Sequence, residues 1–175
     1  MTPATSTGPR IVGPNDGRLA DLGSIAARMM IWTEDVPNGS FSLVEHPMPP
    51  HRLAAPLHKH SREDEYSYVL EGKMGAILGD DVVYAEAGDT VFKPRNQWHT
   101  FWNAGDTPAR ILEIIVPGGF EHFFDELGGF VAAGGPEPEQ FGYLGEKYGI
   151  EFQPETVAEI CEKYGLEHPL LNPQD

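Results

Sequence analysis

Two histidines stand one residue apart in the stretch PLHKHSREDEYSYVLEG, residues 56–72. On a β-strand alternate side chains share a face, so His58 and His60 would point the same way, about 6–7 Å apart. Glu65 follows after a short polar segment that could turn the chain back, and His99 begins a later apolar run. Three imidazoles and one carboxylate that converge would suit a divalent first-row metal with open coordination positions.

The spacing of apolar residues changes once along the chain, which indicates two kinds of secondary structure around these residues. From about residue 24 to 116, short apolar runs alternate with segments rich in Gly, Pro, Asn and Asp. Many short strands at this spacing predict an all-β barrel or sandwich. After Pro117 the apolar residues take helical spacing, and two later segments open with proline and acids and end in Lys-Tyr-Gly. These signals predict two to three short helices at the C-terminal end.

The length of 175 residues suits a single domain. We predict a flexible tail over residues 1–20, a β-barrel over 21–118, and a helical extension packed on the barrel over 119–175. The only cysteine, Cys161, excludes an internal disulfide, and with no apolar stretch long enough to span a membrane we expect a cytoplasmic protein. The net charge of −15 argues against a nucleic-acid partner.

The spacing of these residues is more specific than their types. The pattern H-x-H-x4-E-x6-G from His58, followed by G-x5-P-x4-H-x3-N from Gly88, resembles the two motifs of the cupin superfamily. More narrowly, residues 39–152 are similar to single-domain bacterial cupins related to quercetin 2,3-dioxygenase. The resemblance implies a jelly-roll barrel, possible homodimers, and one divalent metal (iron, nickel, cobalt or manganese). The implied metal ligands are His58, His60, Glu65 and His99.

Two positions depart from that pattern. Arg52 stands where the first motif usually has glycine, which leaves the path of the chain entering the site open. Asn96 stands at the usual glycine of the second motif, and we expect it to keep the turn because Asn tolerates left-handed backbone well. Glu63 and Asp64 could compete as carboxylate ligands, but only Glu65 keeps six residues to the following glycine. Four histidines fit no ligand spacing and are expected at the surface or in the core: His46, His51, His122 and His168.

The alternation of side chains along a strand predicts which residues would line a pocket around such a metal. Ser67 and Val69 share the face of Glu65, and Phe101 shares that of His99. Other candidates come from neighbouring strands and the first C-terminal helix: Phe41, Met48, Phe92, Trp102, Phe120 and Phe124. We expect that helix to pack on the barrel's side, the alternative being a cap over its mouth. An apolar pocket of this kind suits a flat aromatic substrate, and barrel core is the alternative for each residue.

The resemblance implies a metal-dependent dioxygenase that opens a flavonol or similar enolisable aromatic substrate with O2, with Glu65 as catalytic base. A divalent ion with three neutral imidazoles and one carboxylate carries a local charge of +1, which a mono-anionic enolate would neutralise. Two other readings stay open. One is an isomerase, epimerase or lyase without oxygen chemistry, and the other is a non-catalytic cupin that binds a small molecule.

Overall fold

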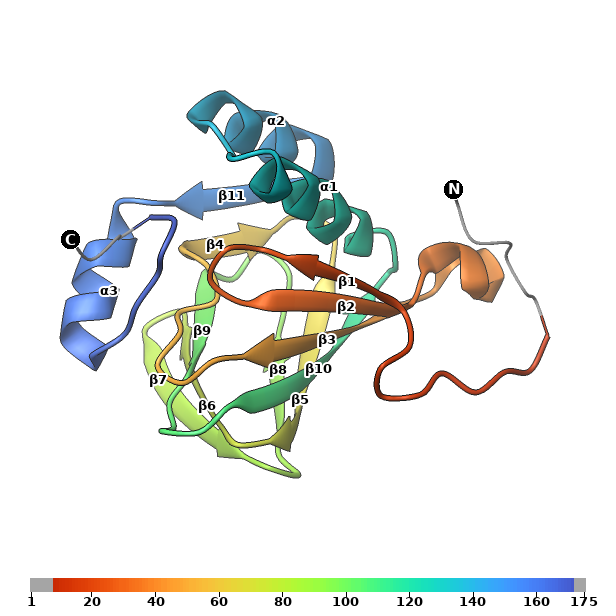
Figure 1. Ribbon diagram of the computed structural model, residues 1–175, viewed down its shortest axis with the longest axis horizontal. Coiled ribbons are helices and arrows are strands. Elements are labelled where there is room, and N and C mark those ends of the chain that lie inside the picture. The colour runs from red at the N-terminus through yellow and green to blue at the C-terminus, as the bar shows by residue number, and fades with distance from the viewer. Residues whose placement is uncertain (1–7, 172–175) are drawn as a thin grey trace.

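The structure, a computed structural model, describes residues 8–171, and its centre is a barrel of two antiparallel sheets (Figure 1). The six-stranded sheet has the order β1-β2-β3-β10-β5-β8 and the five-stranded sheet the order β11-β4-β9-β6-β7. The strands are β1 Arg18–Asp21, β2 Ala26–Ile31, β3 Ser42–Met48, β4 Leu57–His60, β5 Asp64–Glu71, β6 Lys73–Leu78, β7 Asp81–Glu86, β8 Thr90–Lys93, β9 His99–Asn103, β10 Ala109–Val116 and β11 Ile150–Gln153. The predicted all-β jelly-roll class is therefore confirmed.

Alternation along three neighbouring strands sets the interior of the barrel. In β5 the side chains of Glu65, Ser67 and Val69 are buried, while Tyr68 and Leu70 between them are exposed. β10 and β8 follow the same two-residue period and pair with β5 on its two sides. Any polar residue at an inward position of these strands is therefore forced into the barrel's interior.

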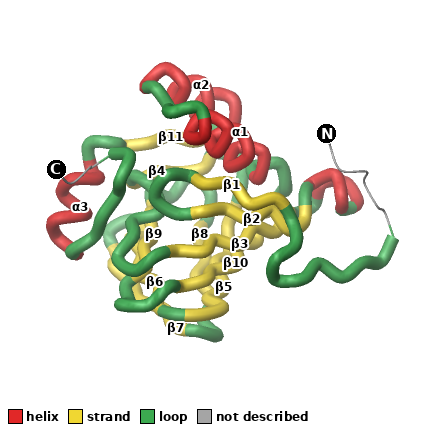
Figure 2. Tube along the Cα trace, in the orientation of Figure 1, coloured by secondary structure: helices red, strands yellow, loops and turns green. Residues whose placement is uncertain are grey.

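The helices gather after the barrel, as the change in apolar spacing predicted (Figure 2). They are α1 Glu121–Ala132, α2 Pro138–Tyr148 and α3 Thr156–Tyr164, and two single 3₁₀ turns, η1 Thr33–Asp35 and η2 Pro37–Gly39, precede β3. α2 and α3 each end at a glycine with positive φ, Gly149 and Gly165. The two Lys-Tyr-Gly stop signals therefore lie at the real helix ends.

Two strands lie outside the ranges that the sequence predicted for the barrel. β1 begins at Arg18, inside the predicted tail, and pairs with β2. β11 lies within the predicted helical extension and pairs with β4, opposite both histidines of that strand. The extension is therefore part of the second sheet as well as a helical cover. Residues 1–7 of the tail and 172–175 of the extension lie outside the described residues.

α3 packs against the side of the barrel over β9, where it forms a second apolar cluster. Trp102 stacks on Tyr164 with ring centroids 4.8 Å apart, and it is buried with Val157 and Ile160 of the helix. This corrects the expectation that Trp102 belongs to the pocket, since its ring faces α3. Gly75 makes room for the indole, because a Cβ at that position would lie 2.3 Å from the Trp102 ring.

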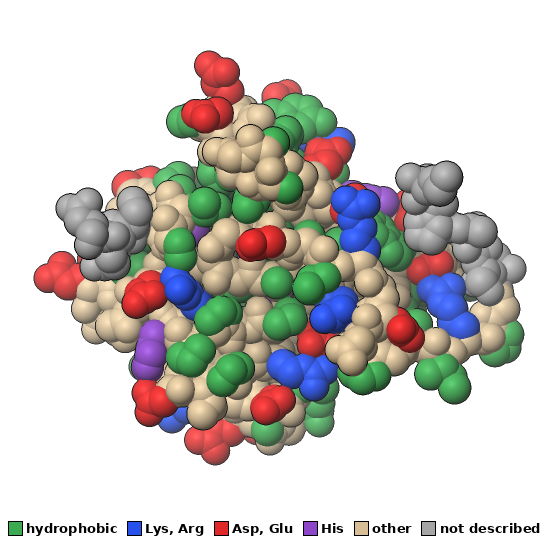
Figure 3. Space-filling view, viewed as in Figure 1, with side chains coloured by type: hydrophobic (Ala, Val, Ile, Leu, Met, Phe, Trp, Pro, Cys, Tyr) green, Lys and Arg blue, Asp and Glu red, His purple; other side chains and the backbone are tan. Residues whose placement is uncertain are grey.

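The face formed by β1, β2, β3 and β10, which is turned toward the viewer, carries acidic, basic and hydrophobic side chains interspersed (Figure 3). Within residues 8–171, the structure contains no helix with the length and apolar character needed to cross a membrane.

Candidate metal centre and cavity

Three histidines from two neighbouring strands meet inside the barrel. His58 and His60 lie on β4, and His58 pairs directly with His99 at the start of β9. The side chains are almost fully buried, and each offers a ring nitrogen within 4.8 Å of those of the other two. This is the convergence that the spacing predicted.

Backbone carbonyls fix which nitrogen two of these rings present. His58 Nδ1 lies 2.8 Å from the Pro56 carbonyl oxygen and His99 Nδ1 lies 3.0 Å from that of Gln97. If each Nδ1–H donates to its carbonyl, each Nε2 keeps a free lone pair, the arrangement usual for metal-ligating histidines. Nε2 of His99 and both ring nitrogens of His60 are buried without a hydrogen-bond partner among the described residues.

Burial favours the neutral form of two of these imidazoles, His58 and His99. Desolvation lowers the pKa of His58 well below its usual value, and the neighbouring His99 and His60 lower it further. Desolvation also lowers the pKa of His99, although Glu65 opposes the change. Buried polar atoms without partners are costly, and neutral imidazoles with free lone pairs are what a divalent cation needs. The donor set present therefore fits a metal ion.

Glu65 is the carboxylate that faces the three histidines. Its Oε1 lies 3.6 Å from His60 Nε2 and its Oε2 lies 3.3 Å from His99 Nε2. Burial alone would raise the pKa of Glu65, but the Lys93 ammonium, together with His60 and His99, brings that pKa well below its usual range. Glu65 is thus an anion beside the imidazoles.

The two competing carboxylates lie elsewhere. Asp64 points outward and forms a bidentate ion pair with Arg95. Glu63 is buried behind His60, with its Oε2 3.7 Å from Nδ1, the nitrogen that faces away from Glu65. Of the three neighbouring acids, Glu65 is therefore the one that lies on the ligand side of His60.

The two departures from the motif have local explanations. Asn96 adopts φ 65°, so the predicted left-handed turn is confirmed, and its N–H donates to the His60 carbonyl at 2.7 Å. Arg52 forms a parallel bridge with Glu167 of the C-terminal segment and an ion pair of 3.1 Å with its carboxylate. The chain entering the site is thus held by residues that follow α3.

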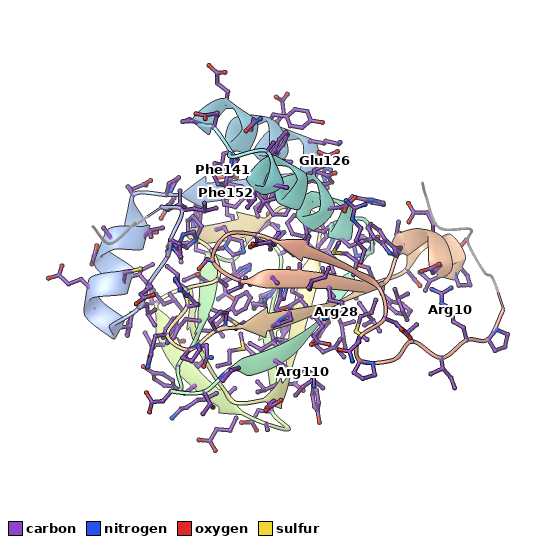
Figure 4. All side chains as sticks on the ribbon, viewed as in Figure 1. Arg10, Arg28, Arg110, Glu126, Phe141 and Phe152 are labelled. Atoms are coloured by element: carbon purple, nitrogen blue, oxygen red, sulfur yellow. The ribbon has the colours of Figure 1, made fainter. Side chains whose placement is uncertain are left out.

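Above the imidazoles lies a cavity of about 690 Å³, counting its opening to solvent. Its aromatic lining is formed by Phe101, Phe120, Phe123, Phe124, Phe141 and Phe152, and its polar lining by His46, His58, His60, Glu65, Glu113 and His168. Figure 4 labels Phe141 and Phe152 where α2 and β11 meet the barrel. The cavity thus combines a largely apolar wall with a few polar groups.

The predicted pocket residues divide into two sets. Phe101, Phe120 and Phe124 line the cavity, and the Phe120 ring lies edge-on to His60 at 4.4 Å between centroids. α1 therefore lies over the mouth of the barrel, which corrects the expectation that it packs on the side. The reason is that its buried residues, all near its N-terminal end, close the cavity with β11.

The remaining candidates lie outside the cavity lining. Met48 and Val69 are fully buried core residues, and Ser67 is buried behind the cavity, where it donates to Glu113. Phe41 is half-buried beside Gly118. Phe92 is corrected: it is 48 % exposed and stacks on Tyr66 outside the barrel, because β8 pairs Phe92 with that outward residue.

Several residues of the site were not predicted from the sequence. Lys93 and Glu113 face inward. Glu113 could have been found from the two-residue period of ILEIIV, whereas the short run TVFK does not decide which face Lys93 takes. Glu113 is buried, which raises its pKa to about 7. His46 lines the cavity from β3, and His168 lines it from the segment after α3. Neither belongs to a motif or spacing that would have indicated a site. His51 and His122 lie near the surface beside Asp106 and Glu34, as expected.

Comparison with known protein families gives a match to the part of the chain that holds the candidate ligands. Residues 44–115 match the family described as Cupin domain. The barrel has a cupin fold. That span holds all four candidate ligands and supports membership of the cupin superfamily, while the helices, β11 and their share of the cavity lie beyond it.

Individual relatives are similar over shorter stretches. An uncharacterized protein of Methanocaldococcus jannaschii is 36 % identical over 61 residues, covering 35 % of this chain and 49 % of that protein. Tetracenomycin polyketide synthase protein TcmJ of Streptomyces glaucescens is 33 % identical over 60 residues, covering 34 % of this chain and 40 % of TcmJ. The chain thus spans less than half the length of these two relatives.

Among solved structures, the polyketide cyclase RemF of Streptomyces resistomycificus superposes with a TM-score of 0.53 at 28 % identity. The match covers 62 % of this chain and 80 % of RemF. None of the proteins named here is described as a quercetin dioxygenase, so that narrower resemblance stays a prediction.

Proposed function

We propose that this protein is a metal-dependent enzyme that activates an enolisable aromatic substrate, with dioxygen as co-substrate. The observation that carries the proposal is the set of three buried histidines and one carboxylate at the floor of a cavity walled by phenylalanines. A bound divalent metal would supply Lewis-acid activation of a substrate hydroxyl there. Iron, nickel, cobalt and manganese all remain candidates for that metal.

The residues of the chain divide the remaining work. His58, His60 and His99 would hold the metal, and Glu65 lies where it can take the hydroxyl proton of a substrate bound beside them. The phenylalanines exclude water and present flat apolar surface to an aromatic ring. His46 Nδ1–H donates to the Ala26 carbonyl oxygen, 3.1 Å away. With Nδ1–H as the donor, Nε2 is left as an acceptor for a substrate hydroxyl.

The charge of the site favours a mono-anionic substrate. Lys93 lies 2.9 Å from Glu65 and 3.0 Å from Glu113, and its pKa is raised by these carboxylates although burial opposes the change. When Glu113 is ionised, it cancels the charge of Lys93. A divalent cation with Glu65 would then leave about +1, which an enolate neutralises.

A second candidate is an oxygen-independent cyclisation or lyase reaction on an aromatic polyketide-like substrate. It is favoured by the relatives, since a polyketide cyclase and a polyketide synthase protein are both similar to this chain. Removal of a proton by Glu65 beside the imidazoles serves this reaction as well. The two candidates differ in their need for O2.

The test is turnover of a panel of flavonols and hydroxylated polycyclic aromatics by metal-loaded protein, with and without oxygen. O2 uptake with incorporation of both oxygen atoms into product supports the dioxygenase. Conversion that is equal without oxygen replaces it by the second candidate. E65Q should abolish either reaction, whereas D64N, which changes the adjacent carboxylate outside the cavity, should retain it. No conversion of any compound by metal-loaded protein would contradict both proposals.

A further inference from the structure

A lysine lies inside the barrel directly behind Glu65. Lys93 is 1 % exposed, because the alternation of β8 turns its side chain inward. Its Nζ lies 2.9 Å from Glu65 Oε2, 3.0 Å from Glu113 Oε2 and 4.7 Å from the centroid of the Phe101 ring. The proposed reaction gives this ammonium group no task of its own.

Packing alone does not explain a lysine at this position. Taking an ammonium ion out of water costs several kcal/mol, and a buried ion pair often stabilises a protein no more than an apolar side chain of similar volume would. The polar surroundings instead form an ordered chain. Ser67 Oγ donates to Glu113 at 2.8 Å, Glu113 accepts from Lys93, and Lys93 donates to Glu65. The chain ends on the one carboxylate that faces the imidazoles.

The contact divides the two oxygens of Glu65 into different roles. Oε2 accepts from Lys93 at 2.9 Å and also lies 3.3 Å from His99 Nε2, while Oε1 faces His60 Nε2 at 3.6 Å and is not engaged by the lysine. An oxygen that already accepts a charge-assisted hydrogen bond is a weaker ligand for a second cation. The orientation of the carboxylate is thereby set from behind.

We propose that Lys93 is a positioning residue that holds Glu65 in a one-oxygen mode, so that only Oε1 is offered to a metal held by the three histidines. The inference rests on the proposed metal centre and adds the residue that sets its coordination number. A carboxylate restricted to one oxygen leaves a further position open for substrate. It also leaves the metal more readily when Glu65 takes a proton.

The test uses Co²⁺ as the probe, with its visible absorption and its affinity as readouts. K93M/E113Q removes Lys93 together with Glu113, the other carboxylate that it binds. Glu113 is therefore not left as a buried anion without a cation beside it. E113Q is the matched control, because Lys93 still holds Glu65 there. In K93M/E113Q, Glu65 is free to bind with both oxygens. The absorption should weaken as the coordination number rises. Co²⁺ should bind roughly tenfold tighter or more than in E113Q, because these two variants differ by the positive charge of Lys93.

The control E113Q should keep the wild-type spectrum. An unchanged spectrum and affinity in K93M/E113Q would overturn the role of Lys93 and leave the metal centre standing. An equal change in E113Q would overturn it as well, by assigning the effect to Glu113. Absence of Co²⁺ binding in wild type would overturn the metal centre itself, and the proposed function with it. Should K93M/E113Q not fold, K93Q/E113Q is read by the same criteria.

Discussion

The neutral His46 inside the cavity predicts a specific loss of stability in acid. Desolvation lowers the pKa of His46 to about 4, and Lys93 adds to the effect while the Ala26 carbonyl, Glu65 and Glu45 oppose it. In the unfolded chain the same imidazole titrates near 6.5. Between these values the unfolded state binds the proton and the folded state does not, so stability is complete above about pH 6.5 and falls as the pH drops toward 4.

The size of the effect follows from the two pKa values. A difference of about 2.5 units corresponds to roughly 3 kcal/mol in full, of which about 2 kcal/mol is lost between pH 7.5 and pH 5. The measurement is urea unfolding of metal-free protein at both pH values, for wild type and H46Q. Glutamine does not titrate, so the drop in unfolding free energy should be smaller by about 2 kcal/mol in H46Q.

His168 offers a second test of the same effect, because desolvation lowers its pKa to about 4 as well. H168Q should remove a similar acid-dependent step, and the double variant should remove both. An identical pH dependence in wild type and H46Q would refute the reasoning, since it would mean that His46 is protonated in the folded state.

Three further predictions concern the metal and the packing around it. Chelation should lower the melting temperature of metal-loaded wild type by about 5–10 °C, since a ligand at a hundred times its Kd contributes about 2.7 kcal/mol, and H99A should show no such shift by calorimetry. G75A should destabilise the fold by about 1–3 kcal/mol in urea unfolding, because its Cβ would meet the Trp102 ring at 2.3 Å, whereas the open position in G129A should cost little. F120A should cost about 3–5 kcal/mol and keep metal, because Phe120 covers His60 without ligating it; loss of metal would contradict that placement.

Much of the barrel could be predicted from local patterns. Short apolar runs between Gly, Pro, Asn and Asp mark the strands, and the spacing from His58 to Glu65 and on to His99 anticipated that these side chains converge. Asn96 was also predictable, because few non-glycine residues tolerate its φ of 65°. The strands and the Asn96 turn depend on residues close together in the chain, whereas the inclusion of His99 in the site came from the resemblance to the second cupin motif.

The roof of the cavity could not be predicted in the same way. Whether α1 covers the barrel's mouth or its side is decided by the contacts of Phe120 with Tyr148 and of Phe123 with Phe152, and both partners lie beyond α1 in sequence. Phe92 was misplaced because its face depends on the register between β8 and β5, and the run TVFK fits either face. The same register buries Lys93, so one misjudged strand hid the ion pair behind Glu65.

The central claim is that His58, His60 and His99 form a metal centre with Glu65. The most direct measurement is metal content by plasma mass spectrometry of untagged protein, for wild type, H99A and the surface control H51A. About one equivalent of iron, nickel, cobalt or manganese in wild type and H51A, lost in H99A, is the predicted result. Wild type without metal after reconstitution, or H99A that retains it, would contradict the claim.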